Sequence, residues 1–236
     1  MNKNIFDGIE EKFPDLLSKG YIKLDNPISN FCDLGKIKKD ITGQIDKKIY
    51  STDNAIQTEL LSKLGVFNCL TPKLYDLARN FFNYKGSMND QYHVMRLVKT
   101  SNIFENYRAH FDSHIFTLVL PIHIPKYDSG SENGELLYFP KARIQPKSEL
   151  ENFIGKFYFK KFASRSGVES LAKTQEVNVE LFEDMKPLIF VGNTTFHTNR
   201  ALQGNSDKFR LTFLSHFFDP SPTWGVGNIL RVLRNR

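Results

Sequence analysis

The amino-acid sequence predicts a mostly β fold with a helical N-terminal part, in the form of a barrel or jelly roll. Three observations support this prediction. From about residue 90, short apolar runs alternate with turn-forming residues, which is typical of strands. Before residue 88, apolar residues recur at helical spacing. The chain also carries 21 phenylalanines among 236 residues, and such large rings suit an interior filled from two sheets.

The N-terminal elements are expected to be mainly helices. Residues 4–19 place apolar side chains at helical spacing, although Pro14 should end or kink that helix. Alternating residues over 21–24 indicate a short strand. Two further helices are expected around 54–65 and 72–83.

The second part of the chain is expected to be built from strands separated by turns, with one polar insertion. The expected strands are Gln91–Lys99, Asn106–His110, Ile115–His123, Glu135–Phe139, Lys156–Phe162, Leu188–Val191 and Lys208–Phe218. Residues 163–186 are polar and mixed, so this segment is interpreted as an insertion helix or a lid. We therefore expect one domain, divided into a helical layer (1–88), a jelly-roll core (89–220) and a basic tail (221–236).

Composition narrows the classes of partner. The net charge is +6, but 32 basic residues are spread along the chain beside 26 acidic ones, and no nucleic-acid-binding motif is present, so a nucleic-acid partner is not expected. Cys32 and Cys69 lack the spacing of a zinc site. No signal-like segment or apolar run of membrane-spanning length is seen, which predicts a reducing cytoplasm as the location.

The tail over residues 227–236 is basic and amphipathic. It is interpreted either as a terminal helix docked on the barrel or on a second subunit, or as a peripheral contact with a membrane surface. The oligomeric state is left open.

Two histidines and an aspartate form the most informative pattern. His110 and Asp112 are two residues apart at the head of an apolar strand, so their side chains lie on one face and can bind one metal ion. His197 follows a later apolar run. Two histidines and one carboxylate that leave coordination positions open are the ligand set of non-haem Fe(II) oxygenases.

The complete order resembles the Fe(II)/2-oxoglutarate-dependent oxygenase superfamily. His-x-Asp is followed by an apolar strand with a threonine, a long gap, His197, and then the pair Arg210-x-Thr212. The resemblance covers about residues 90–220 and implies a double-stranded β-helix, a jelly-roll or cupin-like barrel with a helical N-terminal layer. It also implies Fe(II) bound by the His-Asp-His triad, with O2 and 2-oxoglutarate as co-substrates.

The same resemblance implies a partner for the distal carboxylate of 2-oxoglutarate. Arg210 offers a guanidinium fork to a carboxylate, and Thr212 can donate its hydroxyl from the same strand face. The superfamily's usual spacing from the distal histidine is slightly shorter, which makes Lys208 the alternative anchor.

The implied reaction is hydroxylation of an unactivated C–H bond with release of succinate and CO2. Desaturation and cyclisation stay open, and the substrate is expected to be a small or lipid-linked, anionic molecule. The alternative functions are a non-redox, cupin-like metal isomerase or sugar-binding barrel, and a binding barrel with a vestigial site. Cupins usually supply a larger histidine cluster, which the motif does not contain.

Several other residues are weaker candidates. His114 is expected to be structural or to contact substrate. Arg108 could face the mouth of the site, and Arg200 could contact an anionic substrate. The remaining histidines, His93, His123 and His216, are interpreted as ordinary strand residues.

Overall fold

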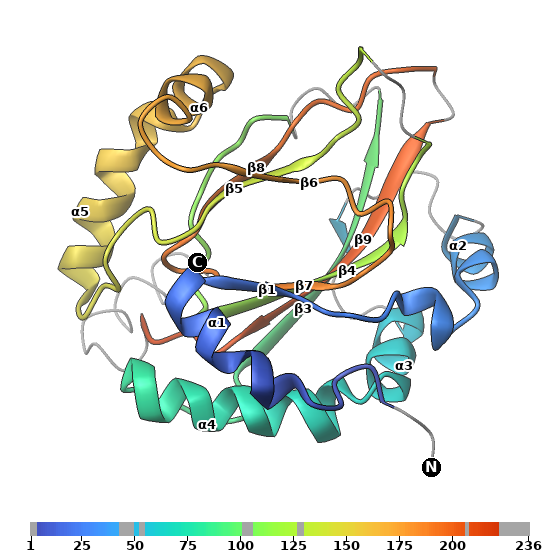
Figure 1. Cartoon of the computed structure of the whole chain (residues 1–236), viewed down its shortest axis with the longest axis horizontal. Helices are drawn as coiled ribbons and strands as arrows, with labels where there is room; N and C mark the ends of the chain where they lie inside the picture. The colour runs from blue at the N-terminus through green and yellow to red at the C-terminus, as the bar shows by residue number, and fades with distance from the viewer. Residues whose placement is uncertain are drawn as a thin grey trace, which may run out of the picture.

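Two antiparallel sheets face each other across the interior of the molecule (Figure 1). The computed structural model describes residues 4–42, 50–51, 55–100, 106–126, 130–205 and 208–221. The larger sheet has the strand order β1-β7-β4-β9-β3-β2, and the smaller has the order β6-β5-β8. Within the described residues the strands form these two facing sheets, a jelly-roll arrangement, and do not close into one continuous barrel.

The strands are short except for the central three of the larger sheet. The larger sheet contains β1 (Tyr21–Lys23), β2 (Tyr50–Ser51), β3 (Gln91–Lys99), β4 (Phe116–His123), β7 (Leu188–Val191) and β9 (Phe209–Phe217). The smaller sheet contains β5 (Leu136–Phe139), β6 (Asn178–Glu180) and β8 (Phe196–Asn199).

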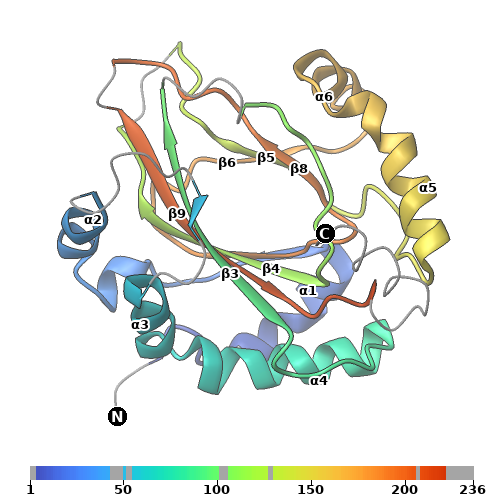
Figure 2. The ribbon, with the colours of Figure 1, turned by 180° about the vertical axis from the view of Figure 1, so that it is seen from behind.

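Helices cover the outer face of the larger sheet and flank one end of the smaller sheet (Figures 1 and 2). The N-terminal helices are η1 (Ile9–Lys12), α1 (Phe13–Lys19), η2 (Ile28–Asn30), α2 (Leu34–Thr42), α3 (Ala55–Lys63), η3 (Val66–Leu70) and α4 (Thr71–Phe82). Their buried side chains form one apolar cluster with the outer face of the larger sheet. The later helices are α5 (Glu149–Phe159), η5 (Lys160–Phe162) and α6 (Arg165–Leu171). These pack on the smaller sheet, in a second cluster.

The register of β3, β9 and β4 gives the larger sheet two different faces. Met95, Phe213 and Leu120 lie side by side in one row, and all three are fully buried under the helices. Side chains one residue away along each strand point to the opposite face, because strand residues alternate. That inner face carries rows that line the interior cavity, and one row is Tyr92, His216 and Thr117.

Several sequence predictions are confirmed by these elements. The strands expected at 91–99 and 188–191 have those same bounds, and the strands at 115–123, 135–139 and 208–218 differ by one residue at one or both ends. The short strand near residue 21 and the helices near 54–65 and 72–83 are also present.

Other predictions are wrong, for local physical reasons. Residues 156–162 are helical, because Ser148 caps α5 by accepting a hydrogen bond from the backbone N–H of Glu151, and helical apolar spacing then continues. Pro14 stands in the first turn of α1, where its fixed φ and missing N–H are tolerated, so it begins a helix rather than ending one. The segment 106–110 forms only a bridge at His110, and β8 was not expected.

The structure describes the insertion at 163–186, but only the first residue of the tail. The insertion contains α6 and β6, and β6 is paired with β5, so part of this segment belongs to the smaller sheet. The basic tail expected at 221–236 lies outside the described residues except for Ser221. No helix in the described part of the chain has the length and apolarity needed to cross a membrane.

The buried row of Met95, Phe213 and Leu120 should contribute strongly to stability. We expect Phe213→Ala to lower the free energy of unfolding by about 3–5 kcal/mol, because it removes a fully buried ring between sheet and helices. The matched control is Phe81→Ala on α4, whose side chain is 64% exposed and whose loss should change stability by less than about 0.5 kcal/mol. Urea denaturation measures both, and equal losses would contradict this placement of the core.

Candidate active site

A backbone bridge joins the two histidines of the predicted triad. The N–H of His110 donates to the carbonyl oxygen of His197 at 3.0 Å, and the N–H of His197 donates back to His110 at 3.0 Å. Directly opposed residues in an antiparallel pair carry their side chains on the same face. The two imidazole rings therefore lie side by side, with their centroids 4.5 Å apart.

Hydrogen bonds fix the orientation of both rings. Nδ1 of His110 lies 2.8 Å from the carbonyl oxygen of Arg108, and Nδ1 of His197 lies 3.1 Å from that of Thr195. A carbonyl can only accept, so each Nδ1 carries the proton and each Nε2 keeps its lone pair. The Nε2 atoms lie 3.6 and 3.7 Å from Oδ1 of Asp112, too far for hydrogen bonds. The three ligating atoms lie within 4.8 Å of one another, so they can hold one metal ion.

The second oxygen of Asp112 is anchored by a chain of hydrogen bonds. The hydroxyl of Thr117 donates to Oδ2, and Nδ1 of His216 lies 3.1 Å from the Thr117 hydroxyl. Because the single Thr117 proton goes to the carboxylate, which only accepts, His216 must donate to Thr117. This leaves Oδ1 directed at the two histidines. A carboxylate held in this way presents one oxygen to a metal without further rearrangement.

The pKa shifts of Asp112 and His197 suit metal binding. Burial lowers the pKa of His197 to about 4, so this imidazole is neutral at neutral pH. Although burial acts to raise it, the imidazoles of His197 and His216 hold the pKa of Asp112 well below its ordinary value. For His110, burial acts to lower the pKa, but the neighbouring carboxylate outweighs it and the net shift is upward. An ionised carboxylate and a neutral imidazole are the forms that coordinate metals.

The three residues of the triad line part of a cavity of about 220 Å³ between the two sheets. Arg210 and Thr212 line the same cavity from β9, and both are buried. Arg96 of β3 is paired in register with Thr212 and lines the cavity as well. Between Thr212 and His216 on β9 stands Leu214, and its register partners Val94 and Val119 also line the cavity. Leu136, Phe182 and Phe190 complete the apolar part of the lining. This arrangement matches a molecule with carboxylates at both ends and methylene groups between them.

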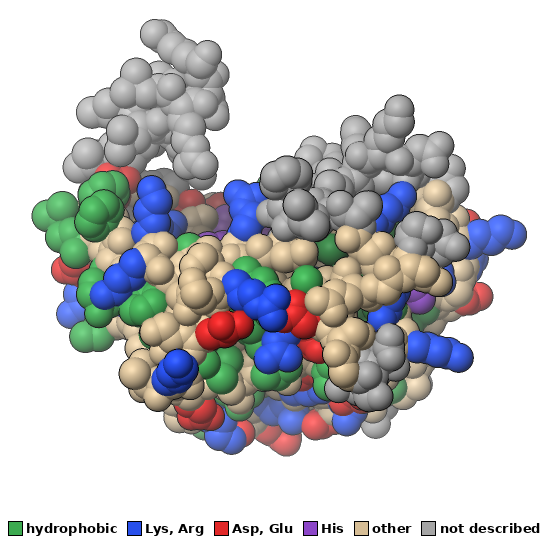
Figure 3. All heavy atoms as spheres, turned by 90° about the horizontal axis from the view of Figure 1, so that it is seen from above, with side chains coloured by type: hydrophobic (Ala, Val, Ile, Leu, Met, Phe, Trp, Pro, Cys, Tyr) green, Lys and Arg blue, Asp and Glu red, His purple; other side chains and the backbone are tan. Residues whose placement is uncertain are grey.

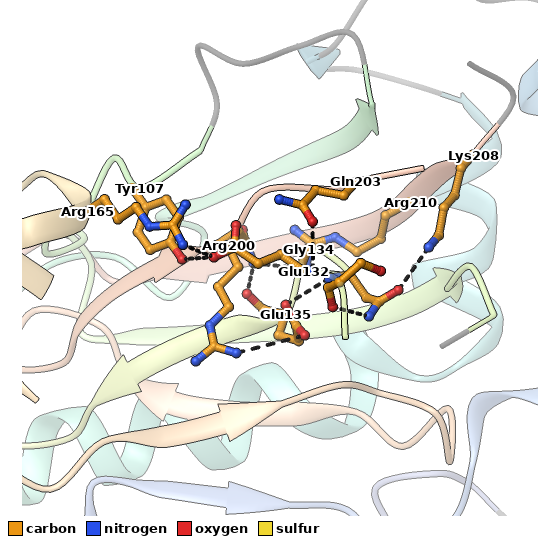
Figure 4. A network of polar contacts seen from close by, with 12 residues as sticks. Tyr107, Glu132, Gly134, Glu135, Arg165, Arg200, Gln203, Lys208 and Arg210 are labelled. Carbon is orange, nitrogen blue, oxygen red and sulfur yellow. Dashed lines mark hydrogen bonds and ion pairs between the residues drawn. The ribbon is translucent and has the colours of Figure 1, made fainter. Parts of the chain in front are cut away.

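Figure 4 shows how the loop opposite β9 holds Arg210 and separates it from Lys208. Arg210 donates to the carbonyl oxygen of Gly134, and Lys208 instead bonds Oδ1 of Asn133 at 2.8 Å. The same loop is tied down by Glu132, which accepts from Tyr107 and forms an ion pair with Arg165 at 2.9 Å. Lys208 does not line the cavity.

Comparison with known proteins gives the fold but no sequence family. No protein-family model matches the chain, and no curated protein matches it. Among solved structures, the non-haem α-ketoglutarate-dependent carbocyclase SnoK from nogalamycin biosynthesis has a TM-score of 0.53 and 11% identity, covering 97% of this chain and 93% of that one. A prolyl hydroxylase from Trichoplax adhaerens, in complex with a hypoxia inducible factor peptide, has a TM-score of 0.54 and 11% identity over 92% of this chain and 94% of that one.

A prolyl 4-hydroxylase from Phytophthora capsici has a TM-score of 0.55 and 13% identity over 93% of this chain. This chain spans only 65% of that longer protein. The chain has the fold of the Fe/2-oxoglutarate-dependent oxygenases. At such low identity the likeness establishes the oxygenase fold alone, and the chemistry has to follow from the residues of the site.

Within this oxygenase fold, the weaker candidates fall into two groups. His114 stacks on Tyr92 and lies beside His216 at the edge of the cavity, with ring centroids 6.4 and 5.6 Å apart. Arg108 and Arg200 do not line the cavity; Nη1 of Arg200 is 4.0 Å from a carboxylate oxygen of Glu135.

His93 and His123 lie away from the cavity. His93 bonds Ser215 at 2.9 Å and packs on Phe67, and His123 packs on Phe209. Their interpretation as ordinary strand histidines agrees with these contacts.

Three cavity residues were missed or misread in the sequence. His216 was interpreted as an ordinary strand histidine, yet it shares the strand parity of Arg210 and Thr212 and reaches the site. That parity could have identified His216 from the sequence. Arg96 and Asn199, which are hydrogen bonded to each other, could not be identified in this way. Only the pairing of β3 with β9 and of β8 with β5 places them in the cavity.

The backbone behind Asp112 leaves no room for a methyl group. A Cβ at Gly192 would lie 2.7 Å from Oγ1 of Thr117 and 3.0 Å from Oδ2 of Asp112. We expect Gly192→Ala to weaken Mn(II) binding by about tenfold or more, because it displaces the carboxylate and its hydrogen-bond donor. Calorimetric titration with Mn(II) measures this. Gly35→Ala in α2 is the control and should bind as the wild type does; an unchanged affinity in Gly192→Ala would contradict the assignment of Asp112.

Proposed function

We propose that the protein is an Fe(II)- and 2-oxoglutarate-dependent dioxygenase that hydroxylates an unactivated C–H bond of a small or lipid-linked, anionic substrate. The observation that carries the proposal is the single cavity that holds both the His110-Asp112-His197 triad and a buried arginine. A metal site alone is compatible with many reactions. A metal site joined by an apolar passage to Arg210 and Thr212 fits a dicarboxylate co-substrate that also reaches the metal.

The ligand chemistry fits ferrous iron. Two imidazoles and one carboxylate on one side of a metal ion leave other positions open, as non-haem Fe(II) oxygenases require. Ferrous iron bound there supplies, together with dioxygen and 2-oxoglutarate, the oxidant that inserts oxygen into the C–H bond while succinate and CO2 are released. The chain contributes the orientation of the three ligands through the carbonyl groups of Arg108 and Thr195 and the hydroxyl of Thr117.

The other end of the cavity fits the distal carboxylate of the co-substrate. Arg210 is 4% exposed and Thr212 is 3% exposed, so a carboxylate bound there is shielded from water. Charge-assisted hydrogen bonds are strongest in such surroundings. The apolar side chains between the two ends exclude water from the methylene groups.

The triad should be necessary for both metal binding and turnover. We expect His110→Ala, Asp112→Ala and His197→Ala each to abolish formation of succinate from 2-oxoglutarate and to weaken Fe(II) binding, because each removes a ligand. Anaerobic Fe(II) titration and chromatography of succinate after exposure to air measure the two effects. His123→Ala is the matched control, since His123 lies outside the cavity. Full turnover by His197→Ala would make this ligand assignment wrong and direct attention to His216.

Arg210 and Lys208 should differ as anchors of 2-oxoglutarate. Losing a shielded, charge-assisted hydrogen bond costs about 2–3 kcal/mol, so we expect Arg210→Ala to raise the Kd for 2-oxoglutarate at least tens-fold, at roughly tenfold per 1.4 kcal/mol. Fe(II) binding should survive, and Arg210→Lys should lose less. Lys208→Ala should change the Kd by less than a few-fold, because Lys208 bonds Asn133 outside the cavity. The opposite ranking would transfer the anchor to Lys208.

The reaction itself is tested with candidate substrates. The protein is loaded anaerobically with Fe(II) and 2-oxoglutarate, mixed with a metabolite or lipid pool and exposed to air. Mass spectrometry should then find a product that has gained one oxygen atom. Tight Fe(II) binding without any 2-oxoglutarate binding or oxidation would instead favour the non-redox metal isomerase.

A further inference from the structure

Helix α5 exposes an apolar stripe to solvent. Ten large apolar side chains are exposed in the described part of the chain, and six of them lie between residues 144 and 158. Those on α5 are Leu150, Phe153, Ile154, Phe157 and Tyr158, and they are between 56% and 70% exposed. Figure 3 shows hydrophobic side chains gathered on the flank of the molecule where α5 lies, with Lys and Arg side chains beside them. We call the five residues the α5 stripe.

The stripe forms one face of a regular, capped α-helix, and not a frayed helix end. Its members follow the i, i+3, i+4, i+7, i+8 spacing that places side chains on one side of a helix. The opposite side is held in the protein by Phe159. Its ring packs edge-on against Phe111, with centroids 4.9 Å apart, and contacts the tilted ring of Phe196 at 5.1 Å. A soluble helix normally turns such a stripe towards the core, so a solvent-facing one marks an interaction site.

The segment that contains the stripe is basic. Residues 141–173 contain eight Lys or Arg and three Glu, which gives this segment a net charge of +5 in a chain whose total is +6. Lys156 and Lys160 are exposed beside the stripe, and the Nζ of Lys161 lies 4.2 Å from the centroid of the Tyr158 ring. Aromatic and aliphatic side chains bordered by lysines are the pattern of helices that lie in the interface of an anionic membrane.

We propose that the α5 stripe and its lysines dock the protein on an anionic phospholipid bilayer. Charge complementarity favours a bilayer over a second copy of the chain or the chain's own tail. A second copy would bring the same +5 segment against itself, and the chain's own tail carries Arg231, Arg234 and Arg236 without any acidic residue after Asp219. Both would repel this surface, whereas anionic headgroups attract the lysines and the acyl region accepts the rings.

The position of the stripe relative to the metal site supports the proposal. A groove beside α5 is lined by Phe153, Phe157, Lys156 and Lys160 on the helix side and reaches the metal ligand His110. The side chain of His110 is 56% exposed, so the metal site opens towards this groove. A bilayer against α5 therefore lies next to His110, on a side from which a membrane-borne substrate can approach the metal site.

Vesicle sedimentation with the full chain tests the proposal. Phosphatidylcholine vesicles with and without phosphatidylglycerol are the probes. We expect binding to the phosphatidylglycerol vesicles, weakened by added salt.

Phe153→Ser/Phe157→Ser should reduce the apparent affinity at least tenfold, because two rings leave the interface. Lys156→Glu/Lys160→Glu/Lys161→Glu should remove the preference for phosphatidylglycerol. The controls, Phe81→Ser on α4 and Lys63→Glu on α3, are also highly exposed and should bind as the wild type does.

Three results would overturn the proposal. One is a wild-type protein that does not bind vesicles containing phosphatidylglycerol. Another is equal binding by wild type and both α5 variants, which would place membrane contact elsewhere in the chain. The third is a dimer in light scattering that Phe153→Ser/Phe157→Ser abolishes, with no vesicle binding, which would make the stripe an interface between copies. Because α5 supplies no ligand of the triad, Fe(II) binding by these variants should be unchanged, and this separates failure of docking from failure of the proposed chemistry.

Discussion

The site depends on one constraint, the pair of backbone hydrogen bonds between His110 and His197. These residues are 87 positions apart in sequence and come from a loop before β4 and from β8 of the smaller sheet. The bridge sets the relative position of the two rings before any side-chain contact is made. Asp112 is then placed by its own N–H, which donates to the carbonyl of Gly192 at 3.2 Å. The proposed ligand set is therefore built on paired backbone, which is more rigid than a set carried by loops alone.

The alternation of side chains along each strand is the feature of the site that can be predicted from the sequence. The parity of Arg210, Thr212 and His216 is readable from the chain, and the structure places all three in the cavity. The position of His110 two residues before Asp112 is readable in the same way, although no regular strand forms there. Local spacing gives these results because the direction of a side chain along one strand does not depend on what the strand pairs with.

Features that depend on pairing or on exposure could not be read in this way. Arg96 enters the cavity only because β3 pairs with β9, and Asn199 only because β8 pairs with β5. Residues 156–162 read as a strand because aromatic residues favour strands, but the cap at Ser148 and the helical spacing of the preceding residues outweighed that preference. Nothing in the sequence says that the apolar face of this helix is turned to solvent, since a buried stripe has the same spacing.

The charges that line the cavity explain why its two proposed occupants belong together. Arg96 and Arg210 bring two positive charges and Asp112 one negative charge, while the low pKa of His197 keeps that ring neutral. On the proposed function, a divalent metal and a dianionic co-substrate enter this space with opposite charges, and together they add no net charge. Either one alone would change the net charge of a shielded cavity by two units, which is costly. The metal and the co-substrate should therefore stabilise each other's binding, because together they leave the net charge of the cavity unchanged.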